Sequence, residues 1–173
     1  MIAFSYDKKV IVEESVENAR EINCAVMGYE ENVETSELEE PLDFKELLTF
    51  DDKYVSNKKT PGTKTMRNLL KKDEPLREEL ERLATKAFTS IDASGNARVD
   101  LLVSKDTGKV YINEINTIPG SVAFYLWEPK GYSFKDLITK MLEIAQAVDT
   151  MKKETVYSYD AELFKRIQYG KKL

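Results

Sequence analysis

Two carboxylates and one carboxamide have the spacing of a cation-binding site. Glu114 and Asn116 stand two residues apart in an extended, alternating run, so both side chains fall on one face of a strand. Asp100 lies in a similar run upstream, and the two runs predict strands at 97–103 and 109–115. The Asp-Thr-Gly-Lys turn between them predicts a hairpin, in which Asp100 meets the other two side chains.

These three oxygen-bearing side chains suit a hard divalent cation. Magnesium is held by carboxylates and by the phosphates of a bound nucleotide. Arg98 shares a strand face with Asp100 and can either stabilise a developing oxyanion or pair with a neighbouring acid. Gly120, in a Pro-Gly turn just downstream, lets backbone N–H groups approach a ligand. The alternative is that these residues are polar because strand edges face water.

Three glutamates flank the first predicted pair of strands. Glu13, Glu14 and Glu21 can accept hydrogen bonds from a ribose or an adenine amino group, or can be surface charges. Farther along, the apolar run 122–127 follows the Pro-Gly turn. Core packing is the default for such a run, but its position also makes it a candidate wall of a small-molecule pocket.

The polar and basic segment 51–72 is predicted to be a long loop. Long segments of this kind inside compact domains are often lids over active sites. Lys53 and Tyr54 lie in it, where the lysine can reach a phosphate and the tyrosine can exclude water. The composition of the segment fits a disordered insertion equally well.

Composition limits the available chemistry. The 173 residues carry a net charge of −5, which argues against a general nucleic-acid binder. The absence of histidine excludes Ser-His triads and histidine metal ligands. Cys24 is the single cysteine and is expected to be a small buried residue. No apolar run reaches the roughly 18 residues of a membrane span, so a cytoplasmic protein is expected.

Periodicity predicts an α+β fold in which helices cover one side of an antiparallel sheet. A capping box at Ser133 and Asp136 predicts a helix to about residue 149. Asp160 is predicted to cap a last short helix, 161–168. The other expected elements are an antiparallel strand pair at 9–12 and 22–27, an acidic loop at 30–40 with six Glu, and a helix opened by residues 73–75 and ending near 90.

Several motifs together resemble the C-terminal part of the D-alanine–D-alanine ligase family, which has the ATP-grasp fold. Asn-Glu-x-Asn-x-x-Pro-Gly at 113–120, combined with Arg-x-Asp at 98–100, is a specific signal. Val-Ile-Val-Glu-Glu at 10–14, Asp-Lys-Tyr at 52–54 and Gly-Tyr-Ser-Phe-Lys-Asp at 131–136 fit the same family. The similarity extends from about residue 7 to about residue 148.

The resemblance implies a role for each candidate. Asp100, Glu114 and Asn116 would hold two Mg²⁺ ions, or Mn²⁺, that bridge the phosphates of ATP. Arg98 and the N–H of Gly120 would stabilise a tetrahedral intermediate. The remaining assignments are Glu13 or Glu14 near the adenine, Glu21 on the ribose, Lys53 and Tyr54 in the closing loop, and Tyr125 and Leu126 at the second substrate.

The implied reaction is the ATP-dependent joining of two D-alanines for a peptidoglycan precursor, and hence for cell-wall biogenesis and cell shape. ATP phosphorylates one D-alanine carboxylate, and the amine of a second D-alanine attacks the acyl phosphate. Residues 1–150 would be the C-terminal ATP-grasp portion and residues 151–173 a C-terminal extension with a short helix. The N-terminal domain and most of the central domain would complete the enzyme, which is a possible homodimer with no nucleic-acid or membrane partner.

This sequence departs from the family pattern in three ways. It begins inside the ATP-grasp region, so it is expected to be a C-terminal portion: a cloned fragment, a truncated gene product or half of a split enzyme, inactive alone. Tyr125 stands where the family usually has a serine that binds the second substrate. One extra residue lies between Glu13 and Glu21, which leaves the choice of Glu13 or Glu14 open, and another lies in the turn before Glu114. The alternatives are a ligase for another amino acid or peptide, and a non-catalytic nucleotide- or protein-binding module.

Overall fold

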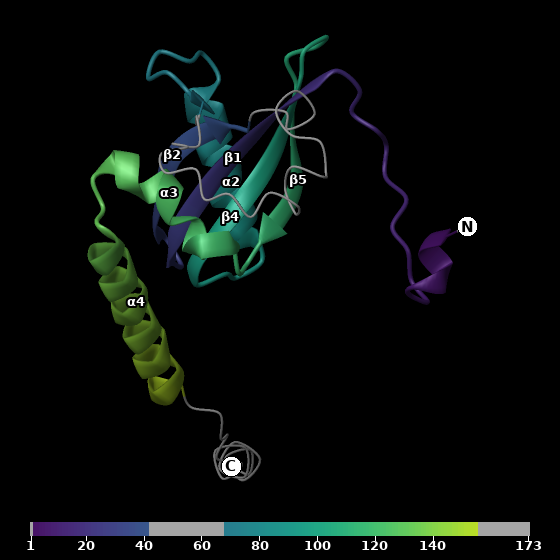
Figure 1. The fold of residues 1–173 in the computed structure, drawn as a ribbon. Coiled ribbons are helices and arrows are strands. Elements are labelled where there is room, and N and C mark those ends of the chain that lie inside the picture. The colour runs from purple at the N-terminus through teal and green to yellow at the C-terminus, as the bar shows by residue number, and fades with distance from the viewer. Residues whose placement is uncertain (1, 42–67, 156–173) are drawn as a thin grey trace, which may run out of the picture.

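The computed structural model describes residues 2–41 and 68–155. Its centre is a five-stranded antiparallel sheet with the strand order β3-β2-β1-β4-β5 (Figure 1). The strands are β1 (Ala19–Tyr29), β2 (Asn32–Glu40), β3 (Asn68–Leu69), β4 (Gly95–Ser104) and β5 (Val110–Asn116). The helices are the 3₁₀ turns η1 (Ile2–Ser5), η2 (Gly120–Ala123) and η3 (Glu128–Lys130), and the α-helices α2 (Arg77–Ser90), α3 (Phe124–Trp127) and α4 (Phe134–Glu154).

The α+β class and the antiparallel sheet are therefore confirmed. One face of the sheet packs against α2. Its strands alternate, as in Ile22, Cys24 and Val26 of β1, and place apolar side chains against Leu80, Phe88 and other residues of the helix. Helix α2 shows the expected helical spacing of its buried residues, Leu80, Ala84, Ala87 and Phe88.

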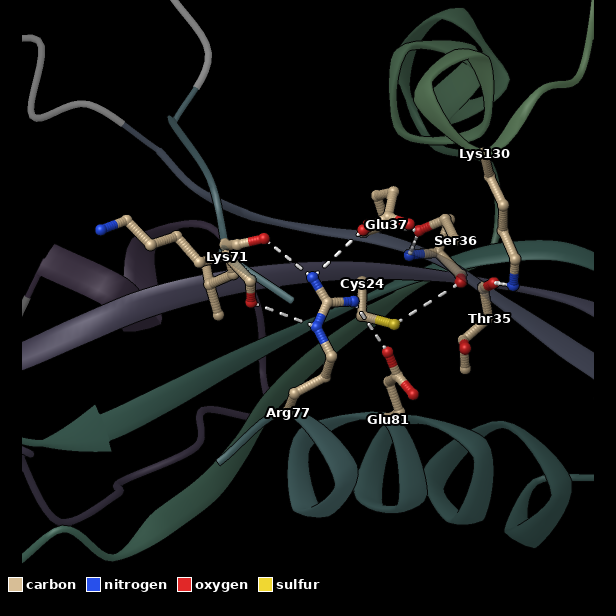
Figure 2. A network of polar contacts seen from close by, with 10 residues as sticks. Cys24, Thr35, Ser36, Glu37, Lys71, Arg77, Glu81 and Lys130 are labelled. Carbon is tan, nitrogen blue, oxygen red and sulfur yellow. Dashed lines mark hydrogen bonds and ion pairs between the residues drawn. The ribbon is translucent and has the colours of Figure 1, made fainter. Parts of the chain in front are cut away.

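Arg77 joins α2 to the sheet (Figure 2). Its guanidinium pairs with Glu37 of β2 at 3.1 Å and with Glu81, one turn along the helix, at 3.0 Å. It also donates to the carbonyl of Leu70 at 2.8 Å. Because Leu70 follows β3 directly, one side chain connects β2, the end of β3 and the first turn of α2.

The opposite face is covered at one end only. Ala25 and Met27 of β1 pack there against Leu126 and Trp127 of α3 and Leu137 of α4. Figure 1 shows α3 across this face, while α4 continues past the edge of the sheet. Helices therefore cover more of the sheet than the one side that was expected. No helix among the described residues covers the remainder of this second face, called the open face below.

The predicted strand at 9–12 and its pairing are wrong, whereas the predicted strand at 22–27 is confirmed. Residues 9–12 form no strand: Ile11 and Val12 are 83% and 91% exposed, with no strand beside them in the described part of the chain. The strand 22–27 is part of β1, which pairs with β2 and β4 instead.

The acidic segment 30–40, predicted to be a loop, is mostly strand β2. Ser36, Leu38 and Glu39 of this strand are buried, and its pairing with β1 is irregular between Thr35 and Leu38. Of the predicted loop 51–72, residues 68–69 form β3, and the buried Leu70 belongs to the core beneath α2. The N–H of Leu70 donates to the carbonyl of Leu38 at 2.9 Å. The remainder of that loop, up to residue 67, lies outside the described residues.

The other helices differ from expectation only at their ends. Helix α2 begins at Arg77 with Leu76 at the N-cap and no side-chain cap, so Asp73 does not cap it. The predicted capping box is confirmed: the Ser133 hydroxyl accepts from the Asp136 N–H, and the carboxylate accepts from the Ser133 N–H. Helix α4 continues to Glu154, past residue 149. The predicted helix 161–168 lies outside the described residues.

Candidate functional site

The β4–β5 hairpin brings the predicted cation ligands together on the open face. In the strand register Asp100 faces Glu114, and Arg98 faces Asn116. A register shift follows, because Leu101 pairs with Ile112 and leaves Asn113 as an extra residue on β5. The bulge keeps Glu114 beside Asp100 on the face opposite α2.

Hydrogen bonds join all four side chains. Arg98 donates to both carboxylate oxygens of Asp100, each at 2.6 Å. The amide nitrogen of Asn116 donates to Asp100 Oδ2 at 3.0 Å and to Glu114 Oε1 at 2.8 Å. Asp100 is 3% exposed, whereas Glu114 is exposed. The cluster therefore has one buried carboxylate at its base and one carboxylate open to a ligand.

Burial and the neighbouring Arg98 act in opposite directions on the pKa of the Asp100 carboxyl. Burial raises the pKa of the Asp100 carboxyl, and hydrogen bonding from Arg98 opposes that rise, while the Glu114 carboxylate adds to it. Hydrogen bonding with Asp100 raises the pKa of Arg98 above its ordinary value. The site thus favours an additional positive charge near its two carboxylates.

The donor set fits a hard divalent cation. Asp100 and Glu114 offer carboxylate oxygens, and rotation of the Asn116 amide would present its oxygen to the same point. The described part of the chain has no cluster of three or more His, Cys, Asp or Glu side chains able to hold a metal. A cation here therefore requires further oxygens, of the kind that nucleotide phosphates and water supply.

Asn96 anchors the turn that borders the cluster. It lies two residues before Arg98, on the same face of β4, and is 7% exposed. Its amide nitrogen donates to the carbonyl of Val122 at 2.7 Å, and its oxygen accepts from Trp127 Nε1 at 3.0 Å. Both halves of the amide are thus used to hold η2 and α3 against β4.

The turn after Gly120 is strained. Ser121, Val122 and Ala123 have φ values of 52°, 49° and 51°, in the left-handed region that non-glycine residues seldom adopt. The bond from the Val122 N–H to the carbonyl of Pro119, at 2.9 Å, closes this turn. Gly120 itself keeps an ordinary φ, and a Cβ added to it would meet no atom within 4 Å, so its surroundings are open.

The two residues expected at the second substrate differ in exposure. Tyr125 is half-buried and lies near Arg98, since its hydroxyl contributes to raising the pKa of the guanidinium. Leu126 is fully buried in the core beneath α3. The Leu126 side chain thus packs in the core, and a role for this residue at the second substrate stays a prediction.

The predicted nucleotide-binding residues are only partly brought to the site. Glu21 lies on β1, on the same face as Asp100, opposite Leu102 of β4. Glu13 and Glu14 are exposed on the irregular segment before β1 and are not placed at the cluster. Lys53 and Tyr54 lie outside the described residues, so their role stays a prediction.

Sequence reasoning missed two asparagines on the open face. Asn96 could have been found from its alternation with Arg98 and Asp100. Asn23 is 6% exposed in the middle of β1 and pairs in register with Asp100. Its sequence neighbours are apolar, and only the pairing of β1 with β4 places it next to the cluster.

Comparison with known proteins agrees with this geometry. The family model described as D-ala D-ala ligase C-terminus matches residues 1–143. A D-alanine–D-alanine ligase of Thermosipho africanus is 40% identical over 164 residues, which cover 94% of this chain and 43% of that protein. The chain thus spans less than half the length of this curated relative.

Solved structures show the same fold. The D-alanine–D-alanine ligase from Coxiella burnetii superposes with a TM-score of 0.66 and 26% identity, over 88% of this chain and 38% of that one. The ligase from Bacillus anthracis, solved in complex with ATP, gives a TM-score of 0.63 at 18% identity, over 90% and 45% of the two chains. With the family model, these similarities show that the chain belongs to the D-alanine–D-alanine ligase family and forms its C-terminal, ATP-grasp portion.

Proposed function

We propose that this chain is the C-terminal ATP-grasp part of a D-alanine–D-alanine ligase, which forms a carbon–nitrogen bond at the expense of ATP. The observation that carries the proposal is the convergence of Asp100, Glu114 and Asn116 beside Arg98 on the open face of the sheet. Membership of the family supports the substrates, D-alanine and ATP, and the product, a dipeptide for peptidoglycan synthesis. A cytoplasmic location follows from the need for ATP.

Each group of residues has a proposed role that follows from its position on the sheet. Glu114, Asp100 and Asn116 would hold Mg²⁺, or Mn²⁺, which when bound supplies positive charge to the phosphates of ATP. Glu21, on the same face, accepts hydrogen bonds from the ribose. The turn from Gly120 borders the cluster and offers a backbone N–H to a developing oxyanion.

Arg98 contributes a positive charge next to the reacting carboxylate. In the first step, a carboxylate oxygen of one D-alanine attacks the terminal phosphorus of ATP, and ADP leaves. In the second, the amine of another D-alanine attacks the acyl phosphate carbon, inorganic phosphate leaves and the amine loses a proton. Arg98 stabilises the negative oxygen of the tetrahedral intermediate between attack and departure.

The test is ADP release by the longer protein that contains this chain. We expect release to depend on D-alanine, and the Glu114→Gln variant to lose it. A protein that gives no amino-acid-dependent ADP release would contradict the ligase function and would favour a non-catalytic nucleotide- or protein-binding module. The 173-residue chain alone is expected to be inactive, because the relatives are more than twice as long; turnover by the purified chain would contradict that expectation.

A second candidate acceptor is suggested by Tyr125. Its hydroxyl lies near Arg98, at the position where the family usually has a smaller serine. A larger side chain there changes the space for the second substrate, so another amino acid or a peptide could replace the second D-alanine. A screen of acceptors with the longer protein, alongside Tyr125→Ser, separates the two: a switch of preference toward D-alanine in the variant would assign specificity to Tyr125.

No helix in the described part of the chain has both the length and the apolar character needed to cross a membrane.

The domains that would complete the nucleotide site are proposed partners within the same protein, and a homodimer of that protein is a further proposal for its assembly.

A further inference from the structure

The side-chain oxygen of Asn23 is a buried hydrogen-bond acceptor without a donor among the described residues. The residue is 6% exposed, and its Oδ1 has no hydrogen-bond partner among the described residues. A buried amide oxygen without a donor destabilises a fold, because folding removes its hydrogen bonds to water and supplies no replacement. An apolar residue at this position of a central strand would avoid that cost, so the oxygen points to a donor that binds there.

The neighbours of Asn23 in the sheet indicate which kind of hydrogen-bond donor would bind its side-chain oxygen. In register it pairs with Asp100 of β4 on one side and with Glu39 of β2 on the other. Asp100 pairs in turn with Glu114. One row across the open face thus holds three carboxylates and one amide, and Asn23 is the immediate neighbour of the buried carboxylate. Paired residues of this kind have Cα atoms about 5 Å apart.

We propose that Asn23 is a further positioning residue of the nucleotide–metal site, whose Oδ1 accepts a hydrogen bond from a water molecule bound to the cation. This inference rests on the proposed cation site at Asp100 and Glu114. Magnesium keeps several waters when proteins bind it, and such waters are strong donors because the metal polarises them. An acceptor between two acidic neighbours suits a donor that carries positive charge.

A ribose hydroxyl is the competing donor. Glu21 lies two residues from Asn23 on the same face, and the family resemblance assigns it to the ribose. Register favours the cation: Asn23 lies opposite Asp100, whereas Glu21 lies opposite Leu102. The two donors differ in one measurable way, since only the cation-bound water makes the contribution of Asn23 depend on metal.

The experiment compares Asn23→Leu with the matched substitution Asn96→Leu in the 173-residue chain. Thermal unfolding gives the stability of each variant. Titration with Mn²⁺ and ADP, followed by electron paramagnetic resonance, gives the metal affinity, and calorimetry with ADP alone gives metal-free binding. Asn23→Asp keeps an acceptor oxygen at the same place, and Glu114→Gln removes a proposed ligand.

We expect Asn23→Leu to raise Tm and to weaken Mn²⁺–ADP binding about three- to tenfold, the effect of one hydrogen bond. Asn96→Leu should instead lower Tm, because both atoms of that amide are paired. Asn23→Asp should retain metal binding. A purely structural role for Asn23 predicts a lower Tm and unchanged metal affinity.

Each contrary result overturns a defined part of the proposal. Unchanged Mn²⁺–ADP affinity in Asn23→Leu, with binding lost in Glu114→Gln, overturns the role of Asn23 and leaves the cation site standing. Equal weakening of binding with and without metal assigns Asn23 to the ribose. A wild-type chain that binds no metal nucleotide overturns the cation site in this chain, and the role of Asn23 with it.

Discussion

Two positively charged groups, the Arg98 guanidinium and the proposed cation, compete for the carboxylate of Asp100. Without a cation, both of its carboxylate oxygens accept hydrogen bonds from Arg98 at 2.6 Å. A cation at the site must draw on the same oxygens, so the guanidinium and the metal compete for one buried carboxylate. In the proposed reaction, a displaced Arg98 would become available to the oxyanion, so cation binding would free the guanidinium for its proposed role.

Replacing the arginine should therefore strengthen metal binding while it abolishes catalysis. We expect Arg98→Gln to bind Mn²⁺ about tenfold more tightly, since hydrogen bonds to a charged group typically contribute about 1.5–3 kcal/mol. In the longer protein the same variant should lose ADP release. Titration followed by electron paramagnetic resonance measures the first effect, with circular dichroism as the check on folding. Unchanged or weaker Mn²⁺ affinity in a folded variant would rule out the competition.

Tyr132 makes the fold sensitive to alkaline pH. Its hydroxyl donates to Glu34 at 2.5 Å, and burial, followed by that carboxylate, raises the pKa of Tyr132 from 10.0 to about 12. The unfolded chain then loses this proton before the folded chain does. The stabilisation is complete below pH 10 and is lost as pH rises through about 12. Urea unfolding from pH 9 to 12 should show a steeper loss of stability in the wild type than in Tyr132→Phe; parallel curves would contradict the assignment.

At the scale of elements, the site depends on how η2 and α3 are attached to β4. Three consecutive residues hold left-handed backbone conformations there, which cost about 1 kcal/mol each or more. Asn96 offsets that strain through its bonds to Val122 and Trp127. The turn beside the proposed cation ligands is therefore held by a side chain of the same strand that carries Arg98 and Asp100.

Removal of that anchor should lower the free energy of unfolding. We expect Asn96→Ala to cost about 2–4 kcal/mol, because a buried indole N–H and a backbone carbonyl each lose their partner. Chemical denaturation measures the change. Asn113→Ala, at the exposed bulge of β5, is the control and should change stability by less than about 0.5 kcal/mol. Equal effects in the two variants would refute the anchoring role of Asn96.

The hairpin was predictable from sequence, whereas its surroundings were not. Alternation and a Gly-containing turn sufficed to place Glu114 and Asn116 beside Asp100. Strand β2 was missed because its many glutamates suggested a solvated loop, although Ser36, Leu38 and even Glu39 are buried in the sheet. The predicted strand at 9–12 failed because β-branched residues favour a strand only where a neighbouring strand exists. Asn23 was missed because its neighbours depend on the strand order of the sheet, which a local sequence pattern does not determine.

At the scale of the whole molecule, a cysteine in the central strand β1 can be used to test whether the domain unfolds as one cooperative unit. Cys24 lies in β1 between β2 and β4, is fully buried, and burial raises the pKa of its thiol to about 12. The thiolate is the reactive form, so reaction requires the core to open. We expect a thiol-specific reagent at pH 8 to label the folded chain no faster than the chain unfolds globally. Rapid labelling without denaturant would show that the sheet opens locally at β1.

The bulge at Asn113 has a consequence for variation in length among relatives. Side chains in a strand alternate, so one inserted or deleted residue normally turns every later side chain to the other face. Because Asn113 sits outside the ladder, between the pairs Leu101–Ile112 and Asp100–Glu114, the hairpin absorbs one additional residue without reversing the strand. Homologous hairpins that are one residue shorter can therefore present the same carboxylate to the same ligand, and the bulge is where natural insertions and deletions in this hairpin are expected to gather.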